Sequence, residues 1–366
     1  MEKIRVGMIG VGQIAKMHLD FYRDIPEAEV VAAADIDESE LNAVSEKYGI
    51  PHRYGDFRKM LERDDLDAVD VCLHNNLHAP ATIAALRAGK NVYCEKPIAG
   101  TYADGKMMLD AARETGRKLH IQLSMLYDRE TKFAKRLIDG GRLGNIYLGR
   151  ASGYRRRGRP FVDGYGSPSF VKKELAGGGA IFDMGVYRLT QVLFLMGLPE
   201  VARVSGKTFQ TMEMDKDRKL ASGYDVEELG LGLVRFTNGA VLEVIEAWAI
   251  HLDQFEGSSV VGTLGGIRLY PFSYMSSMDD IEMTSRPDMD EVDERWHRVN
   301  PLESAGDSSQ KHWIAALQGK VKLINTAEIA LRSMVIQEGI YISDSRGCEV
   351  GADEIISISK SKAAAL

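Results

Sequence analysis

Residues 4–15, IRVGMIGVGQIA, decide the fold of this chain. A short apolar run with strand character ends in the pattern Gly10-x-Gly12-x-x-Ala15, and residues 16–23 continue at helical spacing. Gly10 lets the backbone turn sharply, Gly12 lets phosphates approach the main chain, and the small Ala15 lets helix and strand pack closely. The stretch therefore predicts a strand, a turn and a helix that together bind the pyrophosphate of a dinucleotide.

The start of this helix and the end of the next strand complete the predicted cofactor site. Gly12, Gln13 and Ile14 lie where a helix N-terminus offers N–H groups and a positive dipole end to phosphate. A second strand, residues 29–34, ends at Asp35. A carboxylate at this position accepts hydrogen bonds from the ribose hydroxyls and repels a 2′-phosphate. The sequence thus favours NAD over NADP.

The composition of the 366 residues narrows the class of protein. A formal net charge of −7 offers no attractive field for nucleic acid or for an anionic membrane surface. No apolar run reaches membrane-spanning length, and the first strand begins so early that we expect no signal peptide. Cys72, Cys94 and Cys348 are an odd number without metal-ligand spacing. Because Cys72 and Cys94 lie in apolar runs, we expect buried thiols in a reducing compartment, the cytoplasm.

Strands and helices alternate along the first third of the chain. Such an alternation requires a parallel sheet with right-handed crossovers, and we assign residues 1–123 to a Rossmann domain with a doubly wound sheet. The expected helices span residues 39–48, 57–62, 79–88 and 102–115, and the further strands span residues 67–73, 91–94 and 118–123.

Long strands joined by tight turns follow from about residue 145. Asn238-Gly239 and Gly265-Gly266 read as turns, so we expect an α+β domain, residues 124–358, with an open, mainly antiparallel sheet. The C-terminal helices of this domain are candidates to pack back on the first domain. The fold class is therefore α/β, with a Rossmann domain before this second domain. The expected strands are residues 146–154, 201–212, 227–237, 240–250, 256–263 and 267–270; the expected helices are residues 130–139, 184–195, 310–317 and 326–343. Residues 275–294 read as a surface loop and edge strand, and residues 359–366 as a frayed tail.

Polar side chains follow two strands of the predicted parallel sheet, at the edge where such sheets bind ligands. Leu73, His74, Asn75 and His78 follow one strand, and Glu95-Lys96-Pro97 follows the next. We expect all six residues before the proline to contact the cofactor, with Lys96 directed towards the nicotinamide. A solvated turn is the alternative for Glu95 and Lys96. His74 and His78 also have a spacing that suits a metal, but no further ligand set accompanies them, so no metal is expected.

These motifs resemble the glucose–fructose oxidoreductase / inositol dehydrogenase / MocA (Gfo/Idh/MocA) family. The resemblance rests on the glycine turn, Asp35, Asn75 with His78, the run YCEKP at residues 93–97 and the run GGGAIFDMGVY at residues 177–187. It implies a bound NAD(H) or NADP(H) that oxidises or reduces a sugar or cyclitol. It also implies a second domain whose outer sheet face usually builds a dimer or tetramer, and hence a homo-oligomer.

The same resemblance implies catalytic roles for Lys96, Asp183 and Tyr187, and all three are also expected to contact the substrate. Asp183 and Tyr187 are four residues apart, so on one helical face both can point at one substrate. Family members commonly carry His at the position of Tyr187. A phenol titrates near pH 10, so Tyr187 needs a cation such as Lys96 to act as base; Lys96 itself is the alternative base if burial lowers its pKa. The glycines at residues 177–179 allow another group to approach the backbone closely. The structural alternative for Asp183 is a charge that stabilises a helix N-terminus, and the alternative for Tyr187 is an aromatic residue of the core.

The loop after residue 154 carries further candidates. Arg156 and Tyr165 belong to a stretch in which arginines alternate with aromatic residues, and such side chains hydrogen-bond and stack on sugars. A solvated basic surface and an oligomer contact are the alternatives. We interpret the chain as an NAD(H)-dependent oxidoreductase that acts on a secondary hydroxyl of a sugar, glycoside or cyclitol, with C3 of a glucoside as one candidate. An NAD-recycling enzyme that cleaves glycosides by oxidation and elimination stays open, as does a redox-silent sensor of dinucleotide and sugar.

Overall fold

The computed structural model describes residues 3–365; Met1, Glu2 and Leu366 lie outside the described residues, and with them the expectation made for the start of the chain. The contacts divide the chain into two compact units. The first unit comprises Met1–Gln122, Leu302–Glu328 and Ser361–Leu366, and the second comprises Leu123–Pro301 and Ile329–Lys360. No helix of the described part is long and apolar enough to span a membrane.

The first unit contains a six-stranded sheet in which every pair of neighbouring strands is parallel. The strand order β3-β2-β1-β4-β5-β6 is the doubly wound order of dinucleotide-binding proteins, so the predicted Rossmann fold is confirmed. The direction of winding reverses between β1 and β4, and ligands bind at that point of such sheets. The strands are β1 (Ile4–Ile9), β2 (Ala28–Ala34), β3 (His52–Tyr54), β4 (Ala68–Val71), β5 (Asn91–Cys94) and β6 (Leu119–Ile121).

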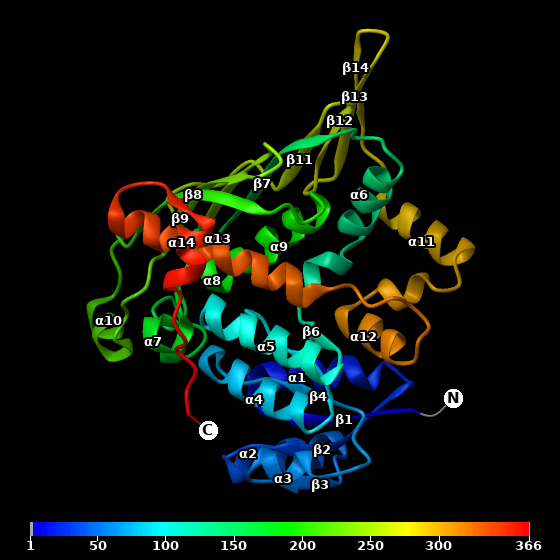
Figure 1. Cartoon of the computed structure of the whole chain (residues 1–366), viewed down its shortest axis with the longest axis vertical. Helices are drawn as coiled ribbons and strands as arrows, with labels where there is room; N and C mark the ends of the chain where they lie inside the picture. Colours follow the sequence, from blue (N-terminus) through cyan, green and yellow to red (C-terminus); the bar gives the residue numbers. More distant parts are fainter. Residues whose placement is uncertain (1–2, 366) are drawn as a thin grey trace. The chain divides into compact units, whose positions relative to one another are not determined.

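Six helices of more than four residues pack on this sheet. Several ends follow from local chemistry: the side chain of Asp37 caps one helix start at Glu40 N (3.0 Å), and Gly49 and Gly116 end two helices in the left-handed conformation. The helices are α1 (Gln13–Arg23), α2 (Glu38–Tyr48), α3 (Phe57–Leu61), α4 (Asn75–Arg87), α5 (Tyr102–Thr115) and α12 (Ser309–Leu317). The helices α4 and α5 lie beside each other (Figure 1).

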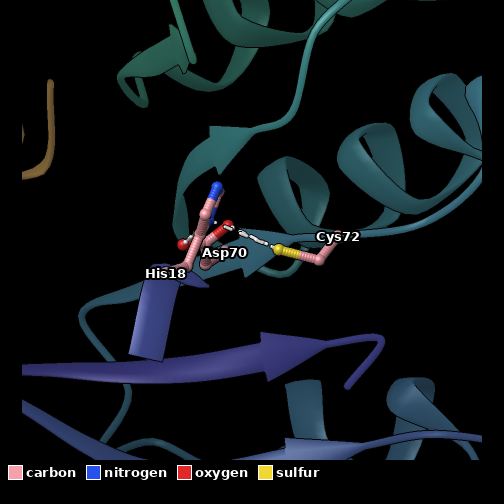
Figure 2. Close-up of side chains that lie close together, drawn as sticks. All are labelled: His18, Asp70 and Cys72. Carbon is pink, nitrogen blue, oxygen red and sulfur yellow. Dashed lines mark hydrogen bonds and ion pairs between the residues drawn. The ribbon is translucent and has the colours of Figure 1, made fainter. Parts of the chain in front are cut away.

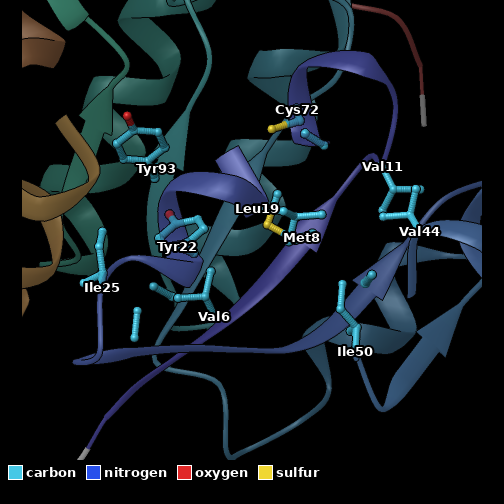
Figure 3. Packing of buried hydrophobic residues seen from close by; sticks show 14 of the residues in the cluster. Val6, Met8, Val11, Leu19, Tyr22, Ile25, Val44, Ile50, Cys72 and Tyr93 are labelled. Carbon is cyan, nitrogen blue, oxygen red and sulfur yellow. The ribbon is translucent and has the colours of Figure 1, made fainter. Parts of the chain in front are cut away.

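The core of the first unit joins segments that are far apart in the sequence. Val6 and Met8 of β1 pack with Leu19 of α1, and the cluster extends to Val44 of α2 (Figure 3). Trp313 of α12 is fully buried in the same cluster. The helix expected at residues 310–317 therefore completes the core of the first unit, although more than 170 residues of the second unit precede it in the chain.

The second unit contains a nine-stranded sheet of the order β14-β13-β12-β11-β7-β10-β9-β8-β15. The pair β7 and β10 is parallel and the other described pairs are antiparallel, which confirms the predicted open, mainly antiparallel sheet. The strands are β7 (Ile146–Tyr154), β8 (Val201–Phe209), β9 (Leu229–Phe236), β10 (Val241–Ala247), β11 (Ser259–Gly262), β12 (Gly265–Arg268), β13 (Ser273–Met278), β14 (Ile281–Ser285) and β15 (Val350–Gly351).

Helices cover one face of this sheet and leave the other face open. Along β9 buried and exposed residues alternate, so that Val234 faces helices whereas Leu231 and Leu233 face outwards. The covering helices include α8, α9 and α13 (Figure 1). The helices of this unit are α6 (Arg129–Asp139), α7 (Lys173–Ala176), α8 (Ala180–Asp183), α9 (Gly185–Leu195), α10 (Lys216–Ser222), α11 (Met289–Val299), α13 (Thr326–Arg346) and α14 (Ala352–Ile358).

The structure corrects two of the expected elements of the second unit. Gly265-Gly266 is not a turn: both glycines begin β12, and the chain reverses at residues 263–264. A Cβ on Gly265 would lie 2.9 Å from the ring of Tyr274, so glycine serves cross-strand packing there. The stretch 275–294 contains the expected edge strand, β14, but its last residues begin α11, which Asp288 caps through its side chain.

Two expectations for the first unit are also wrong. The helix expected at residues 79–88 already begins at Asn75 and contains Pro80. Pro80 has no N–H to donate to the carbonyl of Asn76, four residues earlier, and the N–H of Ala364 donates to this oxygen instead (3.0 Å). The tail is therefore not frayed over its described residues, since Lys362 N also donates to the buried carboxylate of Asp104 (3.0 Å).

Candidate active site

The glycine turn after β1 has the geometry that a dinucleotide needs. Gly10 has a φ of +87°, and a Cβ there would lie 2.5 Å from the carbonyl oxygen of Cys72. Gly12 is the N-cap of α1, and a Cβ at Gly12 would meet nothing within 4 Å. The first N–H groups of α1, including those of Gln13 and Ile14, have no partner within the helix. The open space beside Gly12 and these N–H groups are the two features that binding of a pyrophosphate requires.

Asp35 lies at the end of β2, as expected, and its carboxylate supports the same turn. One oxygen accepts the N–H of Val11 (2.8 Å) and the other accepts the N–H of Asp37 (2.9 Å). Each carboxylate oxygen has a second lone pair, so Asp35 retains capacity for the ribose hydroxyls. The residues present thus fit an NAD molecule at this edge of the sheet.

The segment after β4 forms the first turn of α4. His74 is its exposed N-cap, while Leu73 and Asn75 are partly buried. His78 is fully buried, with Nδ1 2.8 Å from the carbonyl oxygen of Pro97 and Nε2 3.1 Å from that of Leu73. Burial lowers the pKa of His78. Because both ring nitrogens face carbonyl oxygens, His78 joins the two loops at the sheet edge instead of pairing with His74 around a metal.

Glu95 and Lys96 follow β5 at the same edge. Glu95 is buried, and its Oε2 accepts the backbone N–H of Lys96 (2.9 Å) while its Oε1 lies 2.8 Å from Nε2 of His18. Burial acts to raise the pKa of Glu95, but the hydrogen bond and charge of His18 hold it below the ordinary value. The side chain of Lys96 is partly buried. The carboxylate of Glu95, which we expected to contact the cofactor, thus forms hydrogen bonds with His18 and with the backbone of Lys96.

His18 and Asp70 are functional candidates that the sequence analysis missed. The signal for Asp70 was an acid inside the apolar strand β4, because a charge in a strand buried on both faces needs a partner. The signal for His18 was its place in the buried stripe of α1, between Ala15 and Tyr22. Together with Cys72 these side chains form a buried cluster (Figure 2).

In the second unit, the glycine run before Asp183 serves internal packing. A Cβ on Gly179 would overlap the carbonyl oxygen of Glu227, and a Cβ on Gly178 would overlap the hydroxyl of Tyr341. The buried carboxylate of Glu227 accepts the N–H groups of Gly179 (2.8 Å) and Ile181 (2.9 Å). The groups that approach the backbone closely at residues 177–179 are therefore Glu227 and Tyr341 of the same unit.

Asp183 and Tyr187 lie on two short helices instead of one. Asp183 ends α8, α9 begins at Gly185, and Tyr187 N bonds to the carbonyl of Met184 (3.3 Å), only three residues earlier. Asp183 Oδ2 accepts the indole N–H of the fully buried Trp248 (3.3 Å). Both Asp183 and Tyr187 remain partly exposed. The single helical face expected for these two residues is thus interrupted at Met184.

In the loop after β7, the arginine that contacts Tyr165 is Arg155, the chain neighbour of Arg156. The guanidinium of Arg155 lies 5.3 Å from the ring centroid of Tyr165 and 3.2 Å from the sulfur of Met184, next to Asp183. Burial raises the pKa of Tyr165 to about 12, with the charge of Asp183 as a further cause. Arg156 is exposed. Tyr165 and Asp183 are therefore neighbours, as a common substrate site requires.

The loop is anchored by a second arginine. Arg159 is fully buried and pairs with Asp163 (2.9 Å) and Glu228 (2.9 Å). Burial acts to raise the pKa of Asp163, but its hydrogen bonds with Arg159 hold it below the ordinary value. The loop that carries Tyr165 therefore has a fixed base, and Arg159 is not part of a solvated basic surface.

A further carboxyl beside Asp183 has an unusual acidity. Glu246 of β10 is buried, and both of its oxygens lie 3.2 Å from one guanidinium nitrogen of Arg188. Burial raises the pKa of Glu246 to about 7, and the charge of Asp183 adds to the rise. A buried acid that titrates near neutrality is typical of a functional site. No sequence pattern around Glu246 distinguished it from the acids of other strands.

A doubly wound sheet with a glycine turn, an acid after β2 and a lysine at the sheet edge defines an NAD-dependent oxidoreductase. Comparison with known proteins agrees: residues 4–123 match the oxidoreductase family with an NAD-binding Rossmann fold, and residues 131–268 match the GFO/IDH/MocA C-terminal domain. The chain belongs to the Gfo/Idh/MocA family of oxidoreductases, which confirms the resemblance seen in its sequence.

The similarity to individual relatives extends over most of the chain. D-glucoside 3-dehydrogenase of Escherichia coli is 30% identical over 355 residues, which cover 95% of this chain and 97% of that enzyme. D-apiose dehydrogenase of Paraburkholderia graminis is 25% identical over 349 residues, or 95% of this chain and 89% of the relative. The fold is similar to that of levoglucosan dehydrogenase in complex with NADH and levoglucosan, with a TM-score of 0.77, 20% identity and coverage of 96% and 100% of the two chains.

Proposed function

We propose that this NAD-dependent oxidoreductase oxidises a secondary hydroxyl of a sugar or glycoside, with C3 of a glucoside as the first candidate. The observation that carries the proposal is the similarity to D-glucoside 3-dehydrogenase, which extends over 97% of that enzyme and therefore over both units. A glucoside also suits a site with an acid, an arginine and an aromatic ring, here Asp183, Arg155 and Tyr165.

The first unit would hold the cofactor. Gly10, Gly12, Gln13 and Ile14 would bind the pyrophosphate, and Asp35 would bind the adenosine ribose and disfavour a 2′-phosphate. The edge residues Leu73, His74, Asn75, His78, Glu95 and Lys96 would line or support the nicotinamide end. Bound NAD⁺ supplies the hydride acceptor for the carbinol carbon.

The protein would then handle one proton. The carbinol C–H bond gives up its electron pair as hydride, the hydroxyl O–H bond gives its pair to the new C=O bond, and the proton leaves to a base. We assign this proton transfer to Lys96 and Tyr187, and the orientation of the substrate hydroxyls to Asp183. Two alternatives remain for the base itself, Tyr187 activated by a cation or Lys96 alone.

The test is a substrate screen with purified protein. Glucosides, free sugars and inositol are incubated with NAD⁺, and the absorbance of NADH is recorded against the ketone formed. Equal amounts of NADH and ketone are expected for a dehydrogenase. Cleavage of the glycoside without net NADH would contradict the proposal and favour the recycling mechanism.

Variants then test the assigned residues. Tyr187→Phe keeps the ring but removes the hydroxyl, and we expect turnover to fall by about 10²–10⁴-fold with little change in NADH binding. Lys96→Met is expected to cause a loss of similar size. Tyr147→Phe, an exposed tyrosine of β7, is the matched control. Normal turnover of both Lys96→Met and Tyr187→Phe would refute the assignment.

We further propose a cytoplasmic homo-oligomer that associates through the open face of the nine-stranded sheet. This face carries Leu231 and Leu233 at the surface and a hollow of about 520 Å³ lined by residues such as Arg150 and Phe255. Buried free thiols, as at Cys72 and Cys94, suit a reducing compartment. Light scattering of Leu231→Glu against the unchanged chain tests the interface, and a monomer in both would contradict it.

A further inference from the structure

A buried histidine of α1 lies between two carboxylates at the cofactor edge of the first unit. Nδ1 of His18 is 2.9 Å from Oδ2 of Asp70, and Nε2 is 2.8 Å from Oε1 of Glu95. His18 is 1% exposed, Asp70 is 0% exposed and Glu95 is 6% exposed. Figure 2 shows His18 beside Asp70 at the carboxyl end of β4. Water screens none of these contacts, so each group must be satisfied by the others.

The contacts define the protonation state of His18. An ionised carboxylate only accepts hydrogen bonds, so both ring nitrogens must donate, and a ring that donates twice is the imidazolium cation. Burial acts to lower the pKa of His18, but the charge and hydrogen bond of Asp70 raise it well above the ordinary value. An imidazolium has no lone pair to offer a metal, so we interpret the cluster of His18, Asp70 and Cys72 as a hydrogen-bond network and not as a metal site.

The other titratable groups around His18 are uncharged. The thiol of Cys72 lies 3.4 Å from Nδ1, and the ring of Tyr93 on β5 meets the imidazole edge-on at 5.6 Å. Tyr22 lies on the same helix, and burial raises the pKa of all three groups. The charge of His18 is therefore balanced by Asp70 and Glu95 alone among these neighbours.

The network ends at the backbone of Lys96. Oε2 of Glu95 accepts the N–H of Lys96 at 2.9 Å, so fixing this carboxylate also fixes the peptide that precedes the lysine side chain. On the other side, the carbonyl of Pro97 is held by Nδ1 of His78 at 2.8 Å. Hydrogen bonds thus hold the main chain at the N–H of Lys96 and at the carbonyl of the next residue, Pro97.

We propose that His18 is a positioning residue that fixes Lys96 through the carboxylate of Glu95, with Asp70 keeping His18 in the charged form. The inference rests on the proposed function in one respect, the role of Lys96 in turnover. Without the cation, Glu95 loses the hydrogen bond and the charge of His18, which do more than the charge of Lys96 to keep its buried carboxylate ionised. The carboxylate then takes up a proton or turns away from its position. Either change loosens the hydrogen bond to Lys96 N, although His18 itself never touches the substrate.

The experiment compares His18→Gln, Glu95→Gln and the double variant with the matched control His120→Gln. His120 is also a fully buried histidine of the first unit, but its nitrogens face the hydroxyls of Ser309 and Thr326 at 3.1 Å. We expect His18→Gln to lower kcat about ten- to a hundredfold, as loss of an orienting partner does elsewhere, while KM and the Kd of NADH change little. The double variant should lose no more than the worse single variant, because both changes break one chain of contacts.

Two readouts do not require a substrate. Trace labelling with acetic anhydride, followed by peptide mass spectrometry, measures the reactivity of Lys96 against pH; His18→Gln should change it severalfold and His120→Gln should leave it unchanged. The NMR spectrum of protein with ¹⁵N-labelled histidine should show His18 protonated on both nitrogens at pH 8. A neutral ring at that pH would overturn the inference, and this readout uses the unchanged chain, so it does not depend on how well a variant folds. Unaltered Lys96 labelling in His18→Gln would also overturn it.

The outcomes separate the inference from the proposed function. If Lys96→Met retains turnover, the role given to Lys96 is wrong, while labelling and NMR still decide whether His18 fixes its backbone. If Lys96→Met is inactive but His18→Gln has normal kcat and a normal pH profile, the function stands and the positioning role is wrong. An equal fall of kcat in His18→Gln and His120→Gln would also overturn it, since that result indicates general destabilisation.

Discussion

Replacing Glu246 by Gln should remove a pH dependence of stability that this one side chain creates. In the folded chain burial raises the pKa of Glu246 to about 7, against an ordinary value of 4.5. Between these two pH values the folded state holds the proton and the unfolded state releases it. Stability is therefore highest below about pH 4.5 and falls as the pH rises to about 7. Gln cannot ionise, so Glu246→Gln lacks this slope.

The size of the effect follows from the two pKa values. Their difference corresponds to about 3 kcal/mol of unfolding free energy, because each tenfold change in proton affinity is about 1.4 kcal/mol. A change of 1 kcal/mol moves Tm by about 2–4 °C in domains of about 150–250 residues. From pH 4.5 to pH 8 the Tm of the unchanged chain should therefore fall by about 6–12 °C more than that of the variant. The pairing of ionised Glu246 with Arg188 is already contained in the pKa of about 7, and the difference between Gln and protonated Glu246 is an offset that does not depend on pH.

The measurement is differential scanning calorimetry of both proteins over this pH range, in which the transitions of two units can be followed separately. Glu243→Gln is the control, because Glu243 lies on the same strand, is only half-buried and pairs with Arg150 (2.6 Å). Its curve of Tm against pH should be parallel to that of the unchanged chain. Parallel curves for Glu246→Gln as well would refute the reasoning and mean that Glu246 is ionised at low pH like a surface acid.

Three further results are expected. Asp35→Ala should weaken NADH binding, measured by fluorescence titration, and narrow the preference over NADPH, because the ribose acceptor and the support of Val11 N are both lost; unchanged titrations would contradict the site. Gly179→Ala should destabilise the second unit by about 1–3 kcal/mol in thermal unfolding, because its Cβ overlaps the carbonyl of Glu227, and an unchanged Tm would contradict this. Deleting residues 361–366 should speed hydrogen exchange in the first turn of α4, and equal rates would show that the tail does not hold it.

The sheet of the first unit could be predicted because local signals and the global fold agree. The turn at Gly10 requires glycine, the apolar runs have strand length, and glycines end the helices, so each element is specified by residues close to it. The end of α4 followed the same rule. Its start was predicted four residues too late, at residue 79 instead of Asn75. Pro80 lies inside the helix, and Ala364, 284 positions after this proline, satisfies the carbonyl that it leaves open.

The places in the fold of the residues expected at the cofactor could be predicted for a similar reason. Asp35 and Lys96 come directly after strands, and the carboxyl ends of parallel strands bring such residues together at one sheet edge. Arg155 and Arg156 are adjacent, and the sequence could not tell which of them lies beside Tyr165, because that depends on the direction in which the strand β7 ends. Glu246 resembled any acid of an alternating strand, and its pKa arises from burial and from Asp183, which is 63 positions away.

Buried charges lie next to the proposed functional segments in both units. His18 with Asp70 and Glu95 adjoins Lys96, Arg159 with Asp163 and Glu228 anchors the loop of Tyr165, and Arg188 with Glu246 adjoins Asp183. Burying an ion pair gains little net stability over apolar residues of the same volume, whereas removing one partner is strongly destabilising. Such pairs therefore contribute a defined geometry more than stability. Hydride transfer requires the carbinol carbon to be held to within a fraction of an ångström, and rigid charged pairs next to the proposed functional segments can supply that precision.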